Sequence, residues 1–235
     1  MTKDEVMAQL EALGSEQTRK VLTKHGLPAG SFGVKVGDMK PIQKKIKTDH
    51  GLSLELYETG NSDAMYFAGL IADEQAISKE QLQTWAETAT WYMISEYTVA
   101  WLAADSRFGW ELALEWIESP NPQIATTGWQ TISSLIGIKQ DDELDIPHIE
   151  KLLYRVETTI HNAPNRVRYV MNGFVIAAGG GIASLTDKCI GIGERIGKVK
   201  VEMGGTACKV PVPQDYIRKM VDKGRIGKRK KQARC

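Results

Sequence analysis

The sequence has few of the residues that would indicate a structural metal site, a disulfide framework or a membrane span. Its three cysteines include no Cys-x-x-Cys pair, and its four histidines are scattered without the spacing of zinc ligands. No apolar run is long enough to cross a bilayer, and the N-terminus lacks the character of a signal peptide. We therefore expect a protein of the reducing cytoplasm, with no metal and no membrane segment.

Strand patterns are also scarce. Only residues 198–203 alternate between polar and apolar side chains, and we interpret this isolated segment as an extended connector. A glycine run at 177–181 follows no strand, so we interpret it as a loop between helices rather than a phosphate-binding turn. We find no pattern for a nucleotide, flavin or haem cofactor. Apolar residues recur at helical spacing in twelve segments, near 2–13, 16–25, 38–48, 62–73, 79–88, 91–104, 109–118, 122–135, 146–160, 166–178, 181–196 and 214–223. The predicted fold is all-α.

A faint internal repeat indicates how these helices are arranged. Each copy opens with an Asn suited to N-capping and carries a Gly inside the following helix, where a close neighbouring helix would justify it: Asn61 with Gly69, Asn121 with Gly128, and Asn165 with Gly173. The last two copies begin 44 residues apart, within the range of HEAT and armadillo repeats, although the first interval of 60 is longer. We predict an α-α superhelix, a solenoid that curves to present a concave face. The expected division is a repeat domain at 1–197 and a C-terminal extension at 198–235.

The net charge of +1 hides a strong segregation along the chain. Residues 198–235 contain 12 Lys and Arg against 3 Asp and Glu, a net charge of +9, so the first 197 residues carry −8. Such a run is usually a solvated tail, but its cations could also neutralise phosphates. The candidate phosphate contacts in the tail are Lys228, Arg229, Lys230 and Lys231.

Further basic residues are candidates for a nucleic-acid interface on the solenoid. Lys40 and Lys44 lie in one expected helix, and Arg166 and Arg168 begin another. Cations at a helix N-terminus oppose the helix dipole, so the two arginines call for a reason. The alternative is that all four are exposed solubilising charges. A further hypothesis is a protein-interaction scaffold. The net charge of −8 on the first 197 residues favours it, because an acidic surface repels DNA unless its basic residues cluster on one face.

The segment Thr90–Tyr97 combines aromatic rings with a carboxylate. Tyr92 and Glu96 are four residues apart and share a helix face, and Trp91 precedes them. An ionised carboxylate among aromatic side chains is costly unless it has a partner or a task. One task is to bind a cation between aromatic faces and a negative charge. The simpler alternative is an ordinary ion pair in the core.

Several motifs, in order along the chain, resemble one family. Residues 32–40 resemble the entry to the first core helix of the HEAT-like-repeat DNA alkylation repair proteins, the AlkD-like DNA glycosylases. Residues 55–68 resemble their next repeat, 90–96 their active-site helix, and 166–179 the helix that closes the site. Residues 204–211 resemble the C-terminal signature of one branch.

This resemblance implies a C-shaped stack of helix pairs that binds double-stranded DNA in its concave face, and we expect a monomer. In active members, two adjacent Trp, an Asp on the same helix and a later Trp surround the modified nucleotide. Those members release cationic N3- or N7-alkylpurines, and they do so without flipping the lesion into a pocket.

The sequence departs from the active set at most positions. Trp91 matches the first Trp, but Tyr92 replaces the second, Glu96 replaces the Asp, and Phe174 replaces the closing Trp. Thr126 stands where active members carry a DNA-contacting Arg. Two hypotheses about DNA follow. One is a glycosylase in which Glu96 stabilises the cationic transition state between Trp91, Tyr92 and Phe174; the other is a non-catalytic binder of damaged or branched DNA.

Overall fold

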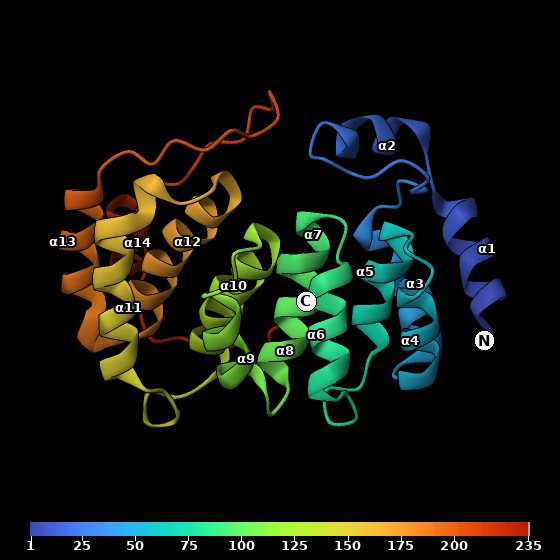
Figure 1. Ribbon diagram of the computed structural model, residues 1–235, viewed down its shortest axis with the longest axis horizontal. Helices are drawn as coiled ribbons and strands as arrows, with labels where there is room; N and C mark the ends of the chain where they lie inside the picture. The colour runs from blue at the N-terminus through green and yellow to red at the C-terminus, as the bar shows by residue number, and fades with distance from the viewer. Residues whose placement is uncertain (235) are drawn as a thin grey trace. The chain divides into compact units, whose positions relative to one another are not determined.

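The computed structural model describes residues 1–234, and every regular element in that range is helical (Figure 1). The chain forms two compact units. The first comprises residues 1–108 with 203–207 and Arg234, and the second comprises residues 109–202 with 208–233. The all-α prediction is confirmed, while the predicted division at residue 198 stays a prediction.

The first unit is built around a completely buried helix. All ten residues of that helix, α5, are buried, and α3, α4 and a π-helical turn pack against it. The elements of this unit are α1 (Lys3–Leu13), α2 (Glu16–Thr23), α3 (Val36–Ile46), α4 (His50–Tyr57), α5 (Ser62–Ile71), α6 (Lys79–Thr88), α7 (Tyr92–Ile94), the π-helix (Ser95–Val99) and α8 (Ala100–Asp105).

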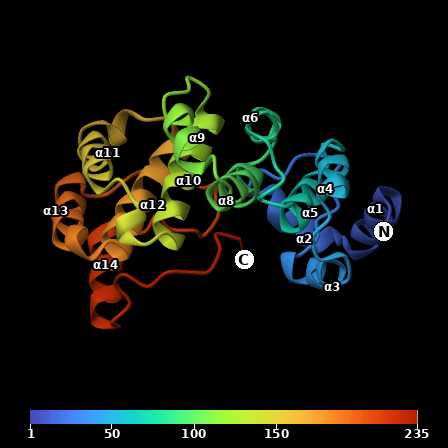
Figure 2. The same cartoon turned by 90° about the horizontal axis from the view of Figure 1, so that it is seen from below.

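Two long helices form the centre of the second unit. The helices α10 and α12 lie side by side, with α9 on one side of the pair and α11 and α13 on the other (Figure 2). The rings of Trp129 on α10 and Phe174 on α12 meet with their centroids 5.2 Å apart. The helices are α9 (Gly109–Trp116), α10 (Pro122–Ile138), α11 (Ile146–Thr159), α12 (Asn165–Gly181), α13 (Thr186–Ile196) and α14 (Pro213–Asp222), with short 3-10 turns at Asp141–Glu143, Ile160–Asn162 and Ala183–Leu185.

No single helix within residues 1–234 is long and apolar enough to span a membrane. Together, α12 and residues 183–196 have sufficient length and composition, but they are bent by 116° relative to each other.

The close approach expected at the repeat glycines occurs at two of the three. A Cβ atom at Gly69 would lie 2.5 Å from Thr98 Cγ2, and one at Gly128 would lie 2.7 Å from the backbone nitrogen of Ile117. A Cβ at Gly173 would meet nothing within 4 Å. The explanation by close packing is therefore wrong for Gly173.

The predicted Asn caps are present in the first two repeat copies and absent from the third. Asn61 accepts hydrogen bonds from the backbone of Asp63 and Ala64, and Asn121 caps α10 through the backbone of Gln123. Asn165 is instead the first residue inside α12, after Pro164. Its side chain exchanges two hydrogen bonds with the backbone of Glu202. The third predicted cap is thus wrong, because the amide binds the connector after α13.

The glycine run is helical, which corrects the prediction of a loop. The helix α12 continues to Gly181 because other elements pack onto its glycines. A Cβ at Gly179 would lie 2.6 Å from the Ile217 side chain of α14, and one at Gly181 would lie 2.5 Å from the Ile136 side chain. Only residues without side chains allow α10 and α14 so close to this turn. The extended connector predicted at 198–203 is confirmed.

Two alanine substitutions should separate these roles in the second unit. At Gly173 the space is open, so Gly173→Ala is expected to stabilise the protein by up to ~1 kcal/mol through helix propensity. At Gly128 the new Cβ would press on the backbone of Ile117 and Ala113, so Gly128→Ala should cost about 2 kcal/mol. Urea unfolding of both variants measures the difference. Equal effects of the two changes would show that α9 can move away from α10.

Candidate functional site

The aromatic and acidic segment contains a π-helical turn. After Trp91, the α-helical turn α7 leads into the π-helix Ser95–Val99, which continues as α8. π-Helical turns are rare in proteins, and those that occur often lie at functional sites. Glu96 is the second residue of the π-helix and has no exposed surface. The hydroxyls of Ser95 and Thr98, also buried, have no hydrogen-bond partner within residues 1–234. The local structure therefore places a carboxylate and two hydroxyl groups in an irregular turn.

Trp91 is held in a fixed orientation beside this turn. It is 7 % exposed, and its Nε1 donates a hydrogen bond of 2.8 Å to the backbone oxygen of His25. The ring of the half-buried Tyr92 meets it edge-on, with centroids 5.5 Å apart. The first unit thus brings Trp91, Tyr92 and Glu96 together on one short segment.

The other two positions of the family comparison lie in the second unit. Phe174 has no exposed surface and packs on Trp129 in the hydrophobic core of that unit. Thr126 on α10 is 1 % exposed, and its hydroxyl has no hydrogen-bond partner in the described chain. The structure assigns Phe174 a core position, and its role beside a nucleotide stays a prediction.

The candidate lysines on α3 are exposed, whereas the arginines on α12 are half-buried. Lys40 and Lys44 are one helical turn apart, so they share a face. The guanidinium of Arg166 lies 4.2 Å from the ring centroid of Tyr169. The buried Nε of Arg168 has no hydrogen-bond partner in the described residues. The lysines are therefore available to solvent anions, while Arg166 stacks on a ring.

The basic tail combines exposed lysines with two anchored arginines. Lys228, Lys230 and Lys231 are exposed. The side chain of Arg229 is only 8 % exposed and donates to Asp141 and to the backbone oxygens of Lys139 and Gly181, at the C-terminal ends of α10 and α12. A cation there is favoured by both helix dipoles. Arg229 stabilises the second unit, and its contribution to DNA binding stays a prediction.

Arg234 is anchored in the first unit by a similar set of acceptors. Its guanidinium donates to the Asp105 carboxylate at 3.2 Å and to the Ala72 backbone oxygen at 2.6 Å, and it pairs with Glu74. Sequence reasoning grouped this residue with a solvated tail, because none of these partners lies near it in the chain.

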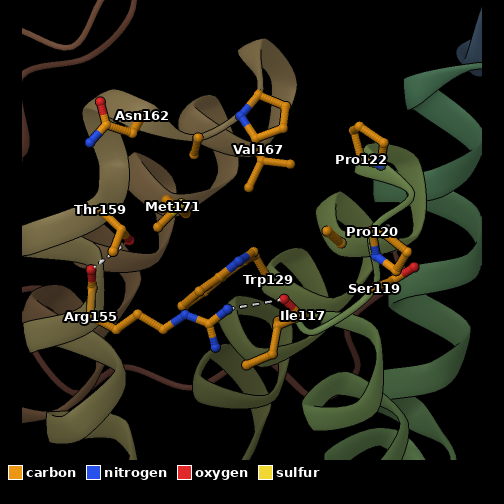
Figure 3. A pocket seen from close by; sticks show the side chains of 13 residues that line it. Ile117, Ser119, Pro120, Pro122, Trp129, Arg155, Thr159, Asn162, Val167 and Met171 are labelled. Atoms are coloured by element: carbon orange, nitrogen blue, oxygen red, sulfur yellow. Dashed lines mark hydrogen bonds between the residues drawn. The ribbon is translucent and has the colours of Figure 1, made fainter.

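A cavity of about 270 Å³ opens between α10, α11 and α12 in the second unit (Figure 3). Trp129, Val167 and Met171 line it together with Pro120, Pro122 and Pro164. The Arg155 guanidinium lies 5.6 Å from the Trp129 ring centroid and also donates to the Ile117 backbone oxygen and to Glu118. Because the Arg155 guanidinium is already paired with Glu118 and Ile117, it is not a free cation for a ligand. The rest of the lining named above is apolar.

The thiol of Cys189 is not suited to nucleophilic chemistry. Cys189 is completely buried in the core of the second unit, and burial raises the pKa of its thiol to about 12. A thiol with that pKa holds almost no thiolate near pH 7. Nor do residues 1–234 contain a group of acidic, Cys and His side chains that could hold a metal ion.

One polar anchor was missed by sequence reasoning. The Asp63 carboxylate at the start of α5 accepts backbone hydrogen bonds from Phe32, Gly33 and Val34, at 2.6, 3.0 and 2.9 Å. Asp63 is 4 % exposed. It fixes the loop before α3 onto α5, and a carboxylate in the first turn of a helix also suits the dipole.

Residues 6–180 match the family model of the DNA alkylation repair enzymes. The chain belongs to this family. Uncharacterized proteins of Listeria innocua and Listeria monocytogenes are each 34% identical to it over 225 residues, 93% of this chain and 97% of the relative. A solved structure from a family related to the HEAT-like repeat DNA glycosylases, with affinity for branched DNA structures, is 37% identical, has a TM-score of 0.92 and covers 100% of both chains. The predicted family and the HEAT-like helical fold are confirmed.

Proposed function

We propose that this DNA alkylation repair family member binds DNA and prefers branched or damaged duplexes. The observation that carries the proposal is the similarity, over the full length of both chains, to a protein with affinity for branched DNA. The exposed lysines of α3 and of the tail support it, because phosphate neutralisation supplies much of the affinity for DNA. We further propose that the protein acts as a monomer in the cytoplasm.

The test compares a four-way junction with a linear duplex of the same length. We expect tighter binding to the junction in fluorescence anisotropy titrations at fixed salt, and weaker binding to both as salt rises. Equal affinity for the two DNAs would remove the preference for branches. The absence of measurable binding to either DNA would overturn the proposal.

The lysines of α3 allow a direct test of which surface meets the phosphates. We expect the double change Lys40→Gln with Lys44→Gln to lower the slope of log affinity against log salt by about 2, since each phosphate contact contributes about 0.9. The matched control changes Lys3 and Lys151, which are also exposed. If both pairs shift the slope equally, α3 is not the specific contact.

A second candidate function, hydrolysis of the N-glycosidic bond of cationic alkylpurines, is favoured by the buried carboxylate in the π-helix. In this reaction water forms a bond to C1′ of the sugar, and the C1′–N bond breaks. The purine leaves with the bonding electrons, which neutralise its positive charge. The attacking water loses a proton to a general base. Glu96 would stabilise the cationic sugar and orient the water. Release of methylated purine from alkylated duplex DNA, measured beside binding, separates this function from binding alone.

A further inference from the structure

The guanidinium of Arg234 lies at the C-terminal end of the buried helix α5. Its Nη1 donates to the backbone oxygens of Gly69 and Ala72, at 3.3 and 2.6 Å. Gly69 belongs to the last turn of α5, and Ala72 is the C-cap. The last carbonyl groups of a helix lack donors within that helix, and the helix dipole favours a cation beside them. Arg234 therefore caps α5, although it comes 162 positions after Ala72 in the chain.

The same residue binds the end of the segment that carries Glu96. The Nε and the backbone nitrogen of Arg234 donate to one carboxylate oxygen of Asp105, at 3.2 and 3.4 Å, and Nη2 pairs with Glu74. Asp105 is the last residue of α8, which follows the π-helix without a break. The side chains of Arg234 and Asp105 are 12 and 6 % exposed. Because little water competes there, these charge-assisted hydrogen bonds are stronger than bonds at an open surface.

The helix α5 and the π-helix touch each other at a residue that Arg234 binds. A Cβ atom at Gly69 would lie 2.5 Å from Thr98 Cγ2, so only a glycine allows this approach. Thr98 belongs to the same π-helix as Glu96. A shift of Gly69 would therefore be transmitted directly to the turn that holds the carboxylate. Arg234 thus binds α5 where it meets the π-helix, and it also binds the end of α8.

The π-helical turn depends on contacts from outside its own segment. Ser95–Val99 has α-helix on both sides, and the α-helical hydrogen-bond pattern is the commoner alternative for such residues. The surroundings therefore decide which of the two patterns is populated. The packing of Thr98 on Gly69 and the binding of Asp105 by Arg234 are two such contacts.

We propose that Arg234 is a positioning residue for the candidate site. By joining the C-terminal ends of α5 and α8, it holds the π-helix in place and so fixes Glu96 beside Trp91. This inference concerns the geometry of the segment, so it applies whether the protein hydrolyses alkylated DNA or only binds DNA.

Fluorine NMR of protein labelled with fluorotryptophan tests the proposal in each unit separately. We expect Arg234→Ala to shift or broaden the signals of Trp91 and Trp101, which lie on either side of the π-helix, and to leave the signals of the second unit unchanged. Amide hydrogens of residues 95–105 should exchange about tenfold faster, since a buried charge-assisted bond is lost. The six tryptophans are Trp85, Trp91 and Trp101 in the first unit and Trp110, Trp116 and Trp129 in the second.

Chemical rescue separates the local role of the guanidinium from a general loss of stability. Arg234→Ala leaves the acceptors of α5 and α8 facing a gap of guanidinium size. Guanidinium chloride at millimolar concentration, far below the denaturing range, should therefore restore the signals of Trp91 and Trp101. Sodium chloride at the same concentration should not restore them.

Two further variants complete the comparison. Arg234→Lys keeps the charge but lacks the planar fork that reaches both helices, so its effect should be intermediate. It also replaces Arg234→Ala in the NMR comparison if that variant does not fold. The matched control is Arg229→Ala, which removes a guanidinium of similar burial, 8 % exposed, from the second unit. This control should leave Trp91 and Trp101 unchanged.

The outcomes decide between a local clamp and a general effect of the tail. Unchanged Trp91 and Trp101 signals, with unchanged exchange of residues 95–105, would overturn the proposal. Equal changes caused by Arg229→Ala, or equal restoration by sodium chloride, would also overturn it. Restoration by guanidinium alone would support the clamp, even if the protein neither bound branched DNA nor released a base.

Discussion

The change Glu96→Gln is expected to lower the release of methylated purine from alkylated DNA by about a thousandfold. A carboxylate ~4 Å from a developing positive charge contributes about 4 kcal/mol at an effective dielectric near 20. That energy corresponds to roughly three orders of magnitude in rate. Glutamine keeps nearly the same shape and removes only the charge, and single-turnover release with excess protein measures the effect.

The control for this prediction is Glu55→Gln, a change of the same type at an exposed position of α4. Circular dichroism and the melting temperature of both variants would show that the fold is retained. Equal release by wild type and Glu96→Gln would remove Glu96 from the chemistry. If wild type releases no base while it binds branched DNA, the family fold here serves binding without hydrolysis.

Removal of the Asp63 side chain is expected to destabilise the protein by about 4 kcal/mol. Asp63→Ala would leave the backbone N–H groups of Phe32, Gly33 and Val34 without their acceptor. Each unpaired buried donor costs ~1–3 kcal/mol, and water can reach the partly buried Phe32. Urea unfolding followed by tryptophan fluorescence would measure the loss.

A matched change in the same unit is Asp49→Ala, which removes an aspartate that caps α4 through one backbone N–H, that of Leu52. The loss of such a cap costs about 1 kcal/mol. Because the Asp63 carboxylate serves three donors in a buried position, its removal should cost several times more. Similar losses for the two variants would show that the loop before α3 finds other partners.

Much of the fold could be predicted from the sequence because helical periodicity is a local signal. The segment 79–88 coincides with α6, and the segment 91–104 with the continuous run from α7 to α8. The helix α4 was missed, since its Leu52, Leu54 and Leu56 alternate as in a strand over only eight residues. Gly179–Gly181 was misread because its helical state depends on α10 and α14, which sequence spacing does not show.

The candidate site was predictable only in part. The proximity of Trp91, Tyr92 and Glu96 follows from their spacing, but a π-helix has no sequence pattern that distinguishes it from the α-helix around it. Arg229 binds Gly181 and Asp141, which lie 48 and 88 positions away in the chain. Arg234 binds Asp105, which lies 129 positions away. Such pairings depend on the packed units, so composition alone assigned these arginines to a solvated tail.

The glycine-rich end of α12 has a consequence for how the second unit opens. Three consecutive glycines contribute almost no helix propensity, so this turn is held by Ile217 and Met220 of α14 and by the guanidinium of Arg229. When α14 detaches, the last turn of α12 loses its support at the same moment. The two segments therefore form one cooperative opening unit, and their amide hydrogens should exchange with solvent together.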